Sequence, residues 1–290
     1  MPTPNQVETL IKKLTIEIQR IPGVTAVVLG GSRARGTQTN DSDIDLGIYY
    51  DSNQQALDVA ALNHIARQFD DKQRPDLLTQ PGGWGPWING GGWLQIEGIP
   101  VDFLYRDLQK VSRVLNDCCQ GRVEMVYQPG HPHGFVSSIY LSEIAVCQTL
   151  WEGSGWAITN LKAQVNPYPL ALQRALIEKF AWEIDFSLKM AHKGVTRRDV
   201  VYTTGCCYRA SACLIQTLFA LNKQYWLNEK GAVAMLESQP LRPADFRNRI
   251  EAAFSALDNQ SVALDLAVEI LNGLLEETAP LVERTLSIRR

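Results

Sequence analysis

One stretch of this chain constrains its fold and chemistry more than any other. Residues 30–45, GGSRARGTQTNDSDID, join a glycine–serine turn to two aspartates spaced i, i+2. The preceding residues 24–29 (VTAVVL) are apolar and rich in β-branched side chains, so they predict a buried strand that leads into the turn. Glycines let backbone N–H groups approach an anion, and a short helix after them would add its N-terminus. We therefore expect a phosphate-binding turn formed by Gly30, Gly31 and Ser32.

The two aspartates lie where the chain returns to apolar sequence. A second strand over residues 43–50 would place Asp43 and Asp45 on one face, because side chains alternate between the faces of a strand. Such a pair suits Mg²⁺, which proteins hold by one or two carboxylates together with substrate phosphates. A solvated acidic loop is the alternative, but two like charges would repel each other at the start of a strand unless a cation lay between them.

The order and spacing of four residues resemble the motif of the nucleotidyltransferase superfamily; they are Gly31, Ser32, Asp43 and Asp45. This superfamily includes DNA polymerase beta, kanamycin nucleotidyltransferase and the small antitoxin nucleotidyltransferases. That family places Gly-Ser before Asp-x-Asp and adds a third carboxylate on a later strand. By this resemblance the third carboxylate is Asp102, the acid inside the strand-like run IPVDFLY. A dinucleotide-binding turn does not fit, because the chain has no Gly-x-Gly-x-x-Gly.

The resemblance implies a metal-dependent enzyme. It would move a nucleoside monophosphate from a nucleoside triphosphate, with ATP expected, to a hydroxyl of a small molecule such as an antibiotic, and it would release pyrophosphate. Two Mg²⁺ ions would be held by Asp43, Asp45 and Asp102. The nucleotide would be bound by Gly30, Gly31, Ser32, Arg35 and Ser42.

Two other functions stay open at this point. One is a protein adenylyltransferase of the antitoxin kind, although those proteins are usually much shorter than this chain. The other is a catalytically silent nucleotide sensor, although intact aspartates at all three positions count against it.

The general base is the least certain part of the expected site. Members of the family remove the proton of the acceptor hydroxyl with a carboxylate, supplied in some by the helical domain and in others by the sheet. Glu143, at the start of the helical half of this chain, is the candidate, and Asp102 and Glu97 are the alternatives.

The pattern along the chain predicts an α/β (α+β) protein with two domains. Residues 1–136 alternate helix and strand signals and are expected to form a nucleotidyltransferase domain, a mixed sheet with flanking helices. Residues 137–290 read almost entirely as helices and are expected to form an all-α bundle that shapes the acceptor site. The expected strands are 24–29, 43–50, 93–97 and 99–105; the expected helices are 5–20, 54–69, 137–150, 170–192, 198–222, 229–237, 243–257 and 260–286.

Composition restricts the partners. A formal net charge of −3 gives no basic surface for long nucleic acid, so a small acceptor is favoured. No run approaches the length of apolar sequence that a membrane span needs, and the first residues lack the apolar core of a signal peptide. The six cysteines show no C-x-x-C spacing, so we expect reduced thiols in a cytoplasmic protein, either a monomer or a homodimer.

Two further motifs have more than one interpretation. Trp84, Trp87 and Trp93 stand among glycines just before Asp102; they either contact a ligand or cover the sheet edge. His131 and His133 lie in a Gly/Pro turn. The motif fits a plain surface turn at least as well as a metal-binding or phosphate-binding site.

Overall fold

The computed structural model describes residues 3–287, which fold into two compact units. One unit, here called the sheet unit, contains the chain up to Asn116 together with Tyr140–Pro167. The other, the helical unit, contains Asp117–Ile139 together with the chain from Tyr168 onward. Residues 140–167 lie in the half that the sequence assigns to the helical domain, yet they pack with the sheet. The expected domain boundary at residue 136 therefore does not coincide with the boundaries of the two packed units.

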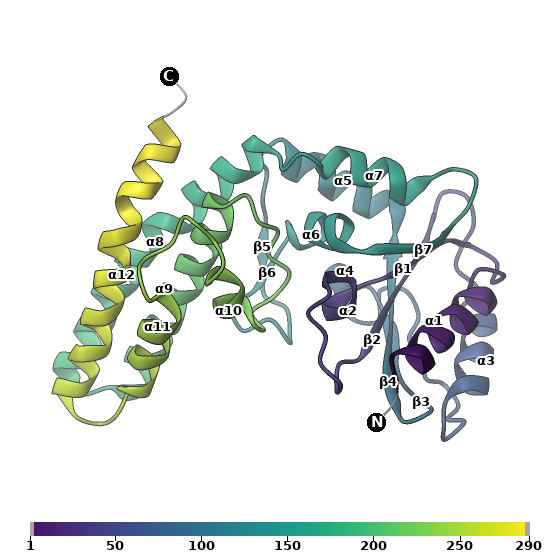
Figure 1. The fold of residues 1–290 in the computed structure, drawn as a ribbon, viewed down its shortest axis with the longest axis horizontal. Helices are drawn as coiled ribbons and strands as arrows, with labels where there is room; N and C mark the ends of the chain where they lie inside the picture. Colours follow the sequence, from purple (N-terminus) through teal and green to yellow (C-terminus); the bar gives the residue numbers. More distant parts are fainter. Residues whose placement is uncertain (1–2, 288–290) are drawn as a thin grey trace. The chain divides into compact units, whose positions relative to one another are not determined.

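Within the described residues, the sheet unit is built on five strands in the order β3-β4-β2-β1-β7 (Figure 1). β2 and β4 are parallel, and the other neighbours are antiparallel. This arrangement is the mixed sheet that the sequence predicts. The strands are β1 (Val24–Leu29), β2 (Ile44–Tyr50), β3 (Gly91–Ile96), β4 (Ile99–Asp107) and β7 (Gln148–Glu152).

One face of this sheet is covered by an apolar core. Helix α1 (Pro4–Ile18) begins at a capping box formed by Thr3 and Gln6, and its buried side chains recur at helical spacing. It packs with α3 (Val59–Phe69) over the inward-facing residues of β2, Ile44, Leu46 and Ile48. The alternate residues of β2 face the opposite side, and these include Asp45.

Among the described residues, helix α6 (Ile139–Val146) covers the later part of β2 and β4 on the opposite face. It supplies Glu143, which pairs with Arg106 near the end of β4. The earlier part of the same face carries Asp45 and Asp102, both half-buried. Remaining helices of the sheet unit are α2 (Gly31–Arg35), α4 (Gly85–Ile88), most of α5 (Leu108–Cys119) and α7 (Ala157–Val165).

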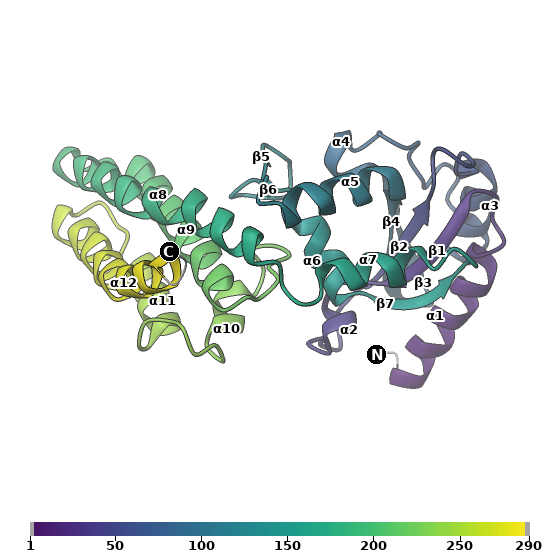
Figure 2. The ribbon, with the colours of Figure 1, turned by 90° about the horizontal axis from the view of Figure 1, so that it is seen from above.

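The helical unit is a bundle around α8 (Leu170–Arg197) and α9 (Val200–Leu221), which run side by side (Figure 2). Helix α9 lies within the expected helix 198–222, and its Cys207, Cys213 and Leu214 are buried in the core of the bundle. The unit is completed by α10 (Ala232–Leu236), α11 (Phe246–Ser255), α12 (Ser261–Ser287) and a small hairpin of β5 (Met125–Val126) and β6 (Phe135–Val136). None of the described helices has the length and apolar character needed to cross a bilayer.

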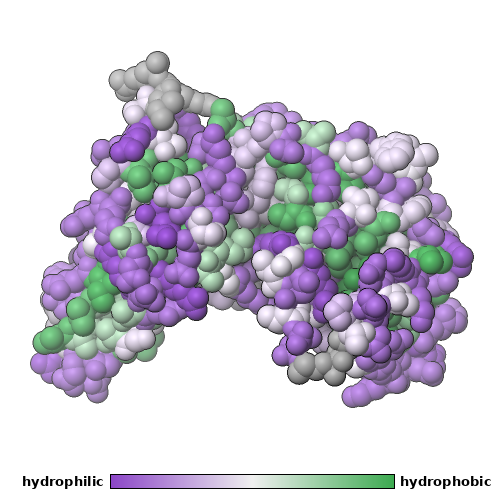
Figure 3. Space-filling model, viewed as in Figure 1, coloured by the Kyte–Doolittle hydropathy of each residue, from purple (hydrophilic) through white to green (hydrophobic). Residues whose placement is uncertain are grey.

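Apolar side chains also lie on the surface of the helical unit. Val201 and Val262 are 84% and 80% exposed, near the first residues of α9 and α12. Figure 3 shows hydrophobic surface at the end of the unit where these two helices begin.

The expected helix over residues 137–150 is wrong in its second half. Helix α6 ends at Val146, and Gln148–Glu152 forms β7, which pairs with the outer edge of β1. The apolar residues of this run are compatible with either structure, and the unpaired edge of β1 decides between them. The sequence signals also missed α5 and α7.

Candidate active site

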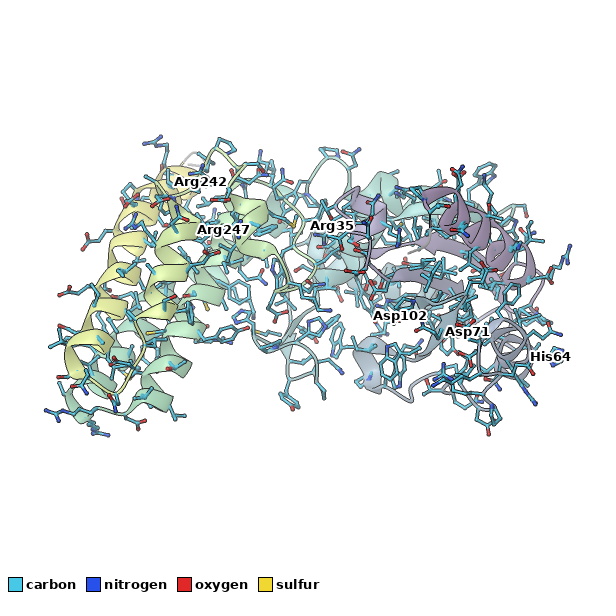
Figure 4. The ribbon with its side chains drawn as sticks, turned by 60° about the horizontal axis from the view of Figure 1, so that its bottom comes forward. Arg35, His64, Asp71, Asp102, Arg242 and Arg247 are labelled. Atoms are coloured by element: carbon cyan, nitrogen blue, oxygen red, sulfur yellow. The ribbon has the colours of Figure 1, made fainter. Side chains whose placement is uncertain are left out.

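Three aspartates converge at one end of the parallel strand pair. Asp43 immediately precedes β2, Asp45 lies on β2, and Asp102 lies on β4 directly opposite Asp45 in the strand register. One carboxylate oxygen from each lies within 4.8 Å of the other two, and all three side chains are half-buried. Figure 4 labels Asp102 at this position. The structure thus brings together the three carboxylates that the sequence predicts as metal ligands.

The donor set fits a divalent cation such as Mg²⁺. All three ligands are hard carboxylate oxygens, and ligands about 2.1 Å from one Mg²⁺ lie at most about 4.2 Å apart. The oxygens of Asp43, Asp45 and Asp102 are therefore close to the spacing that a shared ion requires. A cation between the three carboxylates would also offset their mutual repulsion.

The glycine turn lies directly against this cluster. The Gly30 N–H donates to the Asp45 carbonyl at 2.8 Å, so the turn is tied to β2. Gly31 has a φ of +61°, and a Cβ at this position would lie 1.8 Å from Oδ2 of Asp45. Only glycine satisfies both the backbone conformation and the close approach.

The short helix after the turn leaves backbone donors outside its hydrogen-bond ladder. The first ladder bond of α2 runs from the Ala34 N–H to the Gly30 carbonyl at 3.1 Å. The preceding N–H groups of Gly31, Ser32 and Arg33 therefore take no part in the ladder. Backbone N–H groups in such a turn are suited to an anionic ligand.

Arg33 has a role that the sequence analysis missed. Its guanidinium donates to the carbonyls of Asp43 (2.8 Å) and Ser42 (2.5 Å), so it holds the loop that delivers Asp43. The Ser42 hydroxyl, expected to contact the nucleotide, accepts the Thr39 N–H at 2.9 Å within that loop. The charge of Arg33 in a Gly-Ser-Arg sequence was the available signal, but its carbonyl partners are nine and ten residues away, and only the fold brings them close.

Arg35 lies at the end of α2, on the same short helix as the turn (Figure 4). Burial lowers the pKa of its guanidinium. The group nevertheless remains cationic at neutral pH, because the ordinary pKa of arginine is far above that range. A partly desolvated cation on the same short helix as the glycine turn suits an anionic ligand.

The tryptophan loop is divided between two structural roles. Trp93 lies on β3 directly opposite Asp102, is 63% exposed, and stacks on Trp84 with ring centroids 4.5 Å apart. Trp87 instead packs edge-on against Tyr140 of α6, and Lys110 lies over its ring. Trp87 therefore has a packing role, whereas Trp84 and Trp93 form an accessible aromatic surface beside Asp102. Contact of this surface with a ligand stays a prediction.

Glu143 has a different partner from the one that a general base would need. Its two oxygens accept from Nε and Nη2 of Arg106 at 2.7 and 2.5 Å, and the Arg106 side chain is only 4% exposed. Burial opposes the charge of Arg106, but the carboxylate of Glu143 raises the pKa of Arg106 above its usual value. Arg106 lies four residues beyond Asp102 on β4, which corresponds to about 13 Å along a strand. This geometry gives Glu143 the task of neutralising a buried cation.

Glu97 and the two histidines, the remaining candidates from the sequence, lie outside the aspartate cluster. Glu97, the second alternative base, lies exposed in the β3–β4 turn, where its N–H donates to Asp71 at 2.8 Å. His131 and His133 lie in the helical unit between β5 and β6. In the part of the chain that the structure describes, the aspartate cluster is the one group of three or more His, Cys, Asp or Glu residues arranged to hold a metal, and neither histidine belongs to it.

Comparison with known proteins agrees with this geometry. Residues 11–110 match the family model of the nucleotidyltransferase domain, a span that contains the glycine turn and all three aspartates. The chain is also similar to the crystal structure of a nucleotidyltransferase-like protein from Exiguobacterium sibiricum 255-15, with 12% identity, a TM-score of 0.47, and coverage of 95% of this chain and 78% of that one. Among curated proteins, none matches.

Proposed function

We propose that the chain is a nucleotidyltransferase that transfers a nucleoside monophosphate to a hydroxyl group of a small molecule. The match of residues 11–110 to the family model of the nucleotidyltransferase domain supports this proposal. The donor is a nucleoside triphosphate, expected to be ATP, and pyrophosphate is released. The convergence of Asp43, Asp45 and Asp102 carries this proposal. That cluster lies beside a glycine turn suited to phosphates, as the reaction requires.

The residues of the site divide into three tasks. Asp43, Asp45 and Asp102 would hold the Mg²⁺ ions, which neutralise the triphosphate and polarise the attacking oxygen. The backbone N–H groups of Gly31 and Ser32 bind phosphate oxygens, and the guanidinium of Arg35 adds positive charge.

We assign the removal of the acceptor proton to Asp102 in place of Glu143. A general base must lie within hydrogen-bond reach of the hydroxyl that it deprotonates. Asp102 lies in the cluster at which the reaction takes place, whereas both oxygens of Glu143 bind Arg106. Deprotonation by Asp102 places the proton on a carboxylate that is accessible to water, because this side chain is only half-buried.

The exposed stack of Trp84 and Trp93 supports a small acceptor with a ring. The stack offers an aromatic face next to Asp102, and such faces bind rings of sugars or bases through dispersion and C–H contacts. The chain has a net charge of −3, which does not favour a long nucleic acid as the acceptor.

The proposal is tested by measuring pyrophosphate release with ATP, Mg²⁺ and a panel of hydroxylated small molecules that includes aminoglycosides and lincosamides. A supporting result is acceptor-dependent pyrophosphate release together with a product heavier than the acceptor by one nucleoside monophosphate. Asp45→Asn should lower turnover by about a thousandfold. Asp41→Asn is the matched control, because Asp41 is an exposed carboxylate of the preceding loop and lies outside the cluster. Equal loss in both variants would contradict the assignment.

A further inference from the structure

The helical unit contains a cavity of its own, lined by residues of α9, α10 and α11, the segment before α10, and the turn before β6. Its volume is about 160 Å³. Most of its wall is apolar, with Ile215, Val233, Ile250 and Phe254 among the lining residues. An apolar cavity of about 150 Å³ is large enough for benzene, so this one has room for a single six-membered ring.

Four polar atoms that belong to residues lining this cavity are buried and have no hydrogen-bond partner within residues 3–287. They are the Tyr208 hydroxyl, the Ser211 hydroxyl, Nε1 of Trp226 and Nε2 of His133. His133, Ser211 and Trp226 are each more than nine-tenths buried, at 5%, 3% and 6% exposure. A buried polar group without a hydrogen-bond partner costs free energy. Four such groups around one cavity therefore favour a ligand that supplies the missing partners.

The surroundings of His133 determine which proton its ring carries. Nη1 of Arg209 donates to the His133 carbonyl at 3.1 Å and lies 3.4 Å from Nδ1, so Nδ1 acts as an acceptor. The proton of the neutral ring is therefore on Nε2, the ring atom that has no hydrogen-bond partner among the described residues. Burial, reinforced by the charge of Arg209, lowers the pKa of His133 to about 4, and the ring is neutral at pH 7.

The other wall groups are also donors at neutral pH. The indole of Trp226 can only donate, and burial raises the pKa of Tyr208 to about 12, so its hydroxyl stays protonated. The carboxylate of Glu229 at the rim accepts the His133 N–H at 3.0 Å and lies 3.7 Å from Nδ1 of His131. The residues around the cavity therefore carry several donors, an apolar lining, and a negative charge that already has partners.

We propose that this cavity is a second binding site, separate from the aspartate cluster, for an uncharged six-membered ring that carries hydrogen-bond acceptors. Ring carbonyl oxygens or ring nitrogens would accept from Tyr208, Trp226 and His133, while the apolar wall contacts the faces of the ring. Glu229 disfavours an anionic ligand, and donors that lack an acceptor disfavour a cationic one. The inference concerns binding within the helical unit and does not depend on the transfer reaction.

The test uses the full chain labelled with ¹⁵N and two probes of matched size, 2-pyridone and toluene. The indole N–H resonance of Trp226, identified by its loss in Trp226→Phe, reports on the cavity directly. We expect 2-pyridone to shift this resonance in a saturable way, because its carbonyl accepts a hydrogen bond. Toluene has the same number of heavy atoms but no acceptor, and it should bind at least about tenfold more weakly.

Two variants show whether the cavity is responsible. Tyr208→Phe removes one hydroxyl and should weaken 2-pyridone binding about fivefold to tenfold, whereas Tyr202→Phe, on an exposed position of the same helix, should leave it unchanged. Ala212→Leu places extra volume at the cavity wall and should abolish binding. If 2-pyridone causes no saturable shift, water alone fills the cavity and the proposal is overturned. Equal affinity for 2-pyridone and toluene, or full affinity for 2-pyridone in Tyr208→Phe, overturns the proposal as well. If Ala212→Leu does not fold, Tyr208→Phe still decides the test.

Discussion

Substitution of Gly31 by alanine tests the packing of the glycine turn against the metal ligands. The new Cβ would lie 1.8 Å from Oδ2 of Asp45, whereas real Cβ contacts are essentially never below 3.0 Å. The carboxylate must therefore move by about 1.2 Å or the turn must shift by as much. A misplacement of about 1 Å in a catalytic group can cost about a hundredfold in rate, so we expect kcat/KM to fall at least that far.

Gly36 supplies the matched control for this experiment. It ends α2 with a φ of +72°, but a Cβ there would meet nothing within 4 Å. Alanine at either position costs about 1–2 kcal/mol for the left-handed backbone, which lowers Tm by a few degrees. Only Gly31→Ala should also lose activity, measured as pyrophosphate release by the folded fraction. Equal activity losses in the two variants, or full activity in Gly31→Ala, would refute the argument.

Three further substitutions give distinct results. Trp93→Ala should raise the KM for the acceptor about tenfold and leave kcat nearly unchanged, because it removes a stacking face. Steady-state kinetics would show this, with Trp182→Ala, at another exposed tryptophan, as the control. An unchanged KM would contradict the prediction. Glu143→Gln leaves the charge of Arg106 buried without its partner, so the free energy of unfolding should fall by about 3 kcal/mol in a denaturant titration. The folded fraction should keep the parent kcat. A stable variant with a low kcat would restore Glu143 as the base. The Arg74 side chain, by hydrogen bonding, holds the pKa of Asp70 well below its usual value of 3.8. The stability that this carboxylate contributes is complete above about pH 4 and is lost as the pH falls through its folded-state pKa. Asp70→Asn should therefore lower Tm at pH 7, and the difference from the parent should shrink below pH 4; a constant difference would refute the linkage.

The sequence predicts the aspartate cluster because each part of it has a local signal. Asp43 and Asp45 have strand spacing, and the glycine turn follows a strand that the structure places at the predicted residues. Asp102 is identified by resemblance, and the register that sets it opposite Asp45 is a property of the sheet. No local pattern shows that β4 pairs with β2 in parallel.

The features that sequence analysis missed depend on long-range pairing. β7 forms because β1 has a free edge, and the apolar run that contains it reads equally well as a helix. The partner of Glu143 is Arg106, which is 37 residues away in the sequence. The carboxylate of Glu143 was therefore interpreted as catalytic, whereas in the structure it forms an ion pair with a buried guanidinium. Contacts of Arg33 with the carbonyls of residues 42 and 43 were hidden for the same reason.

The central claim is that Asp43, Asp45 and Asp102 bind the nucleotide through a divalent cation. Calorimetric titration of the full chain with ATP, in the presence of Mg²⁺ and again in EDTA, tests it most directly. The account predicts saturable binding with Mg²⁺, a large loss of affinity in EDTA, and the same loss in Asp45→Asn with Mg²⁺ present, because the carboxylates repel the phosphates unless cations lie between them. Equal affinity with and without Mg²⁺ would contradict it.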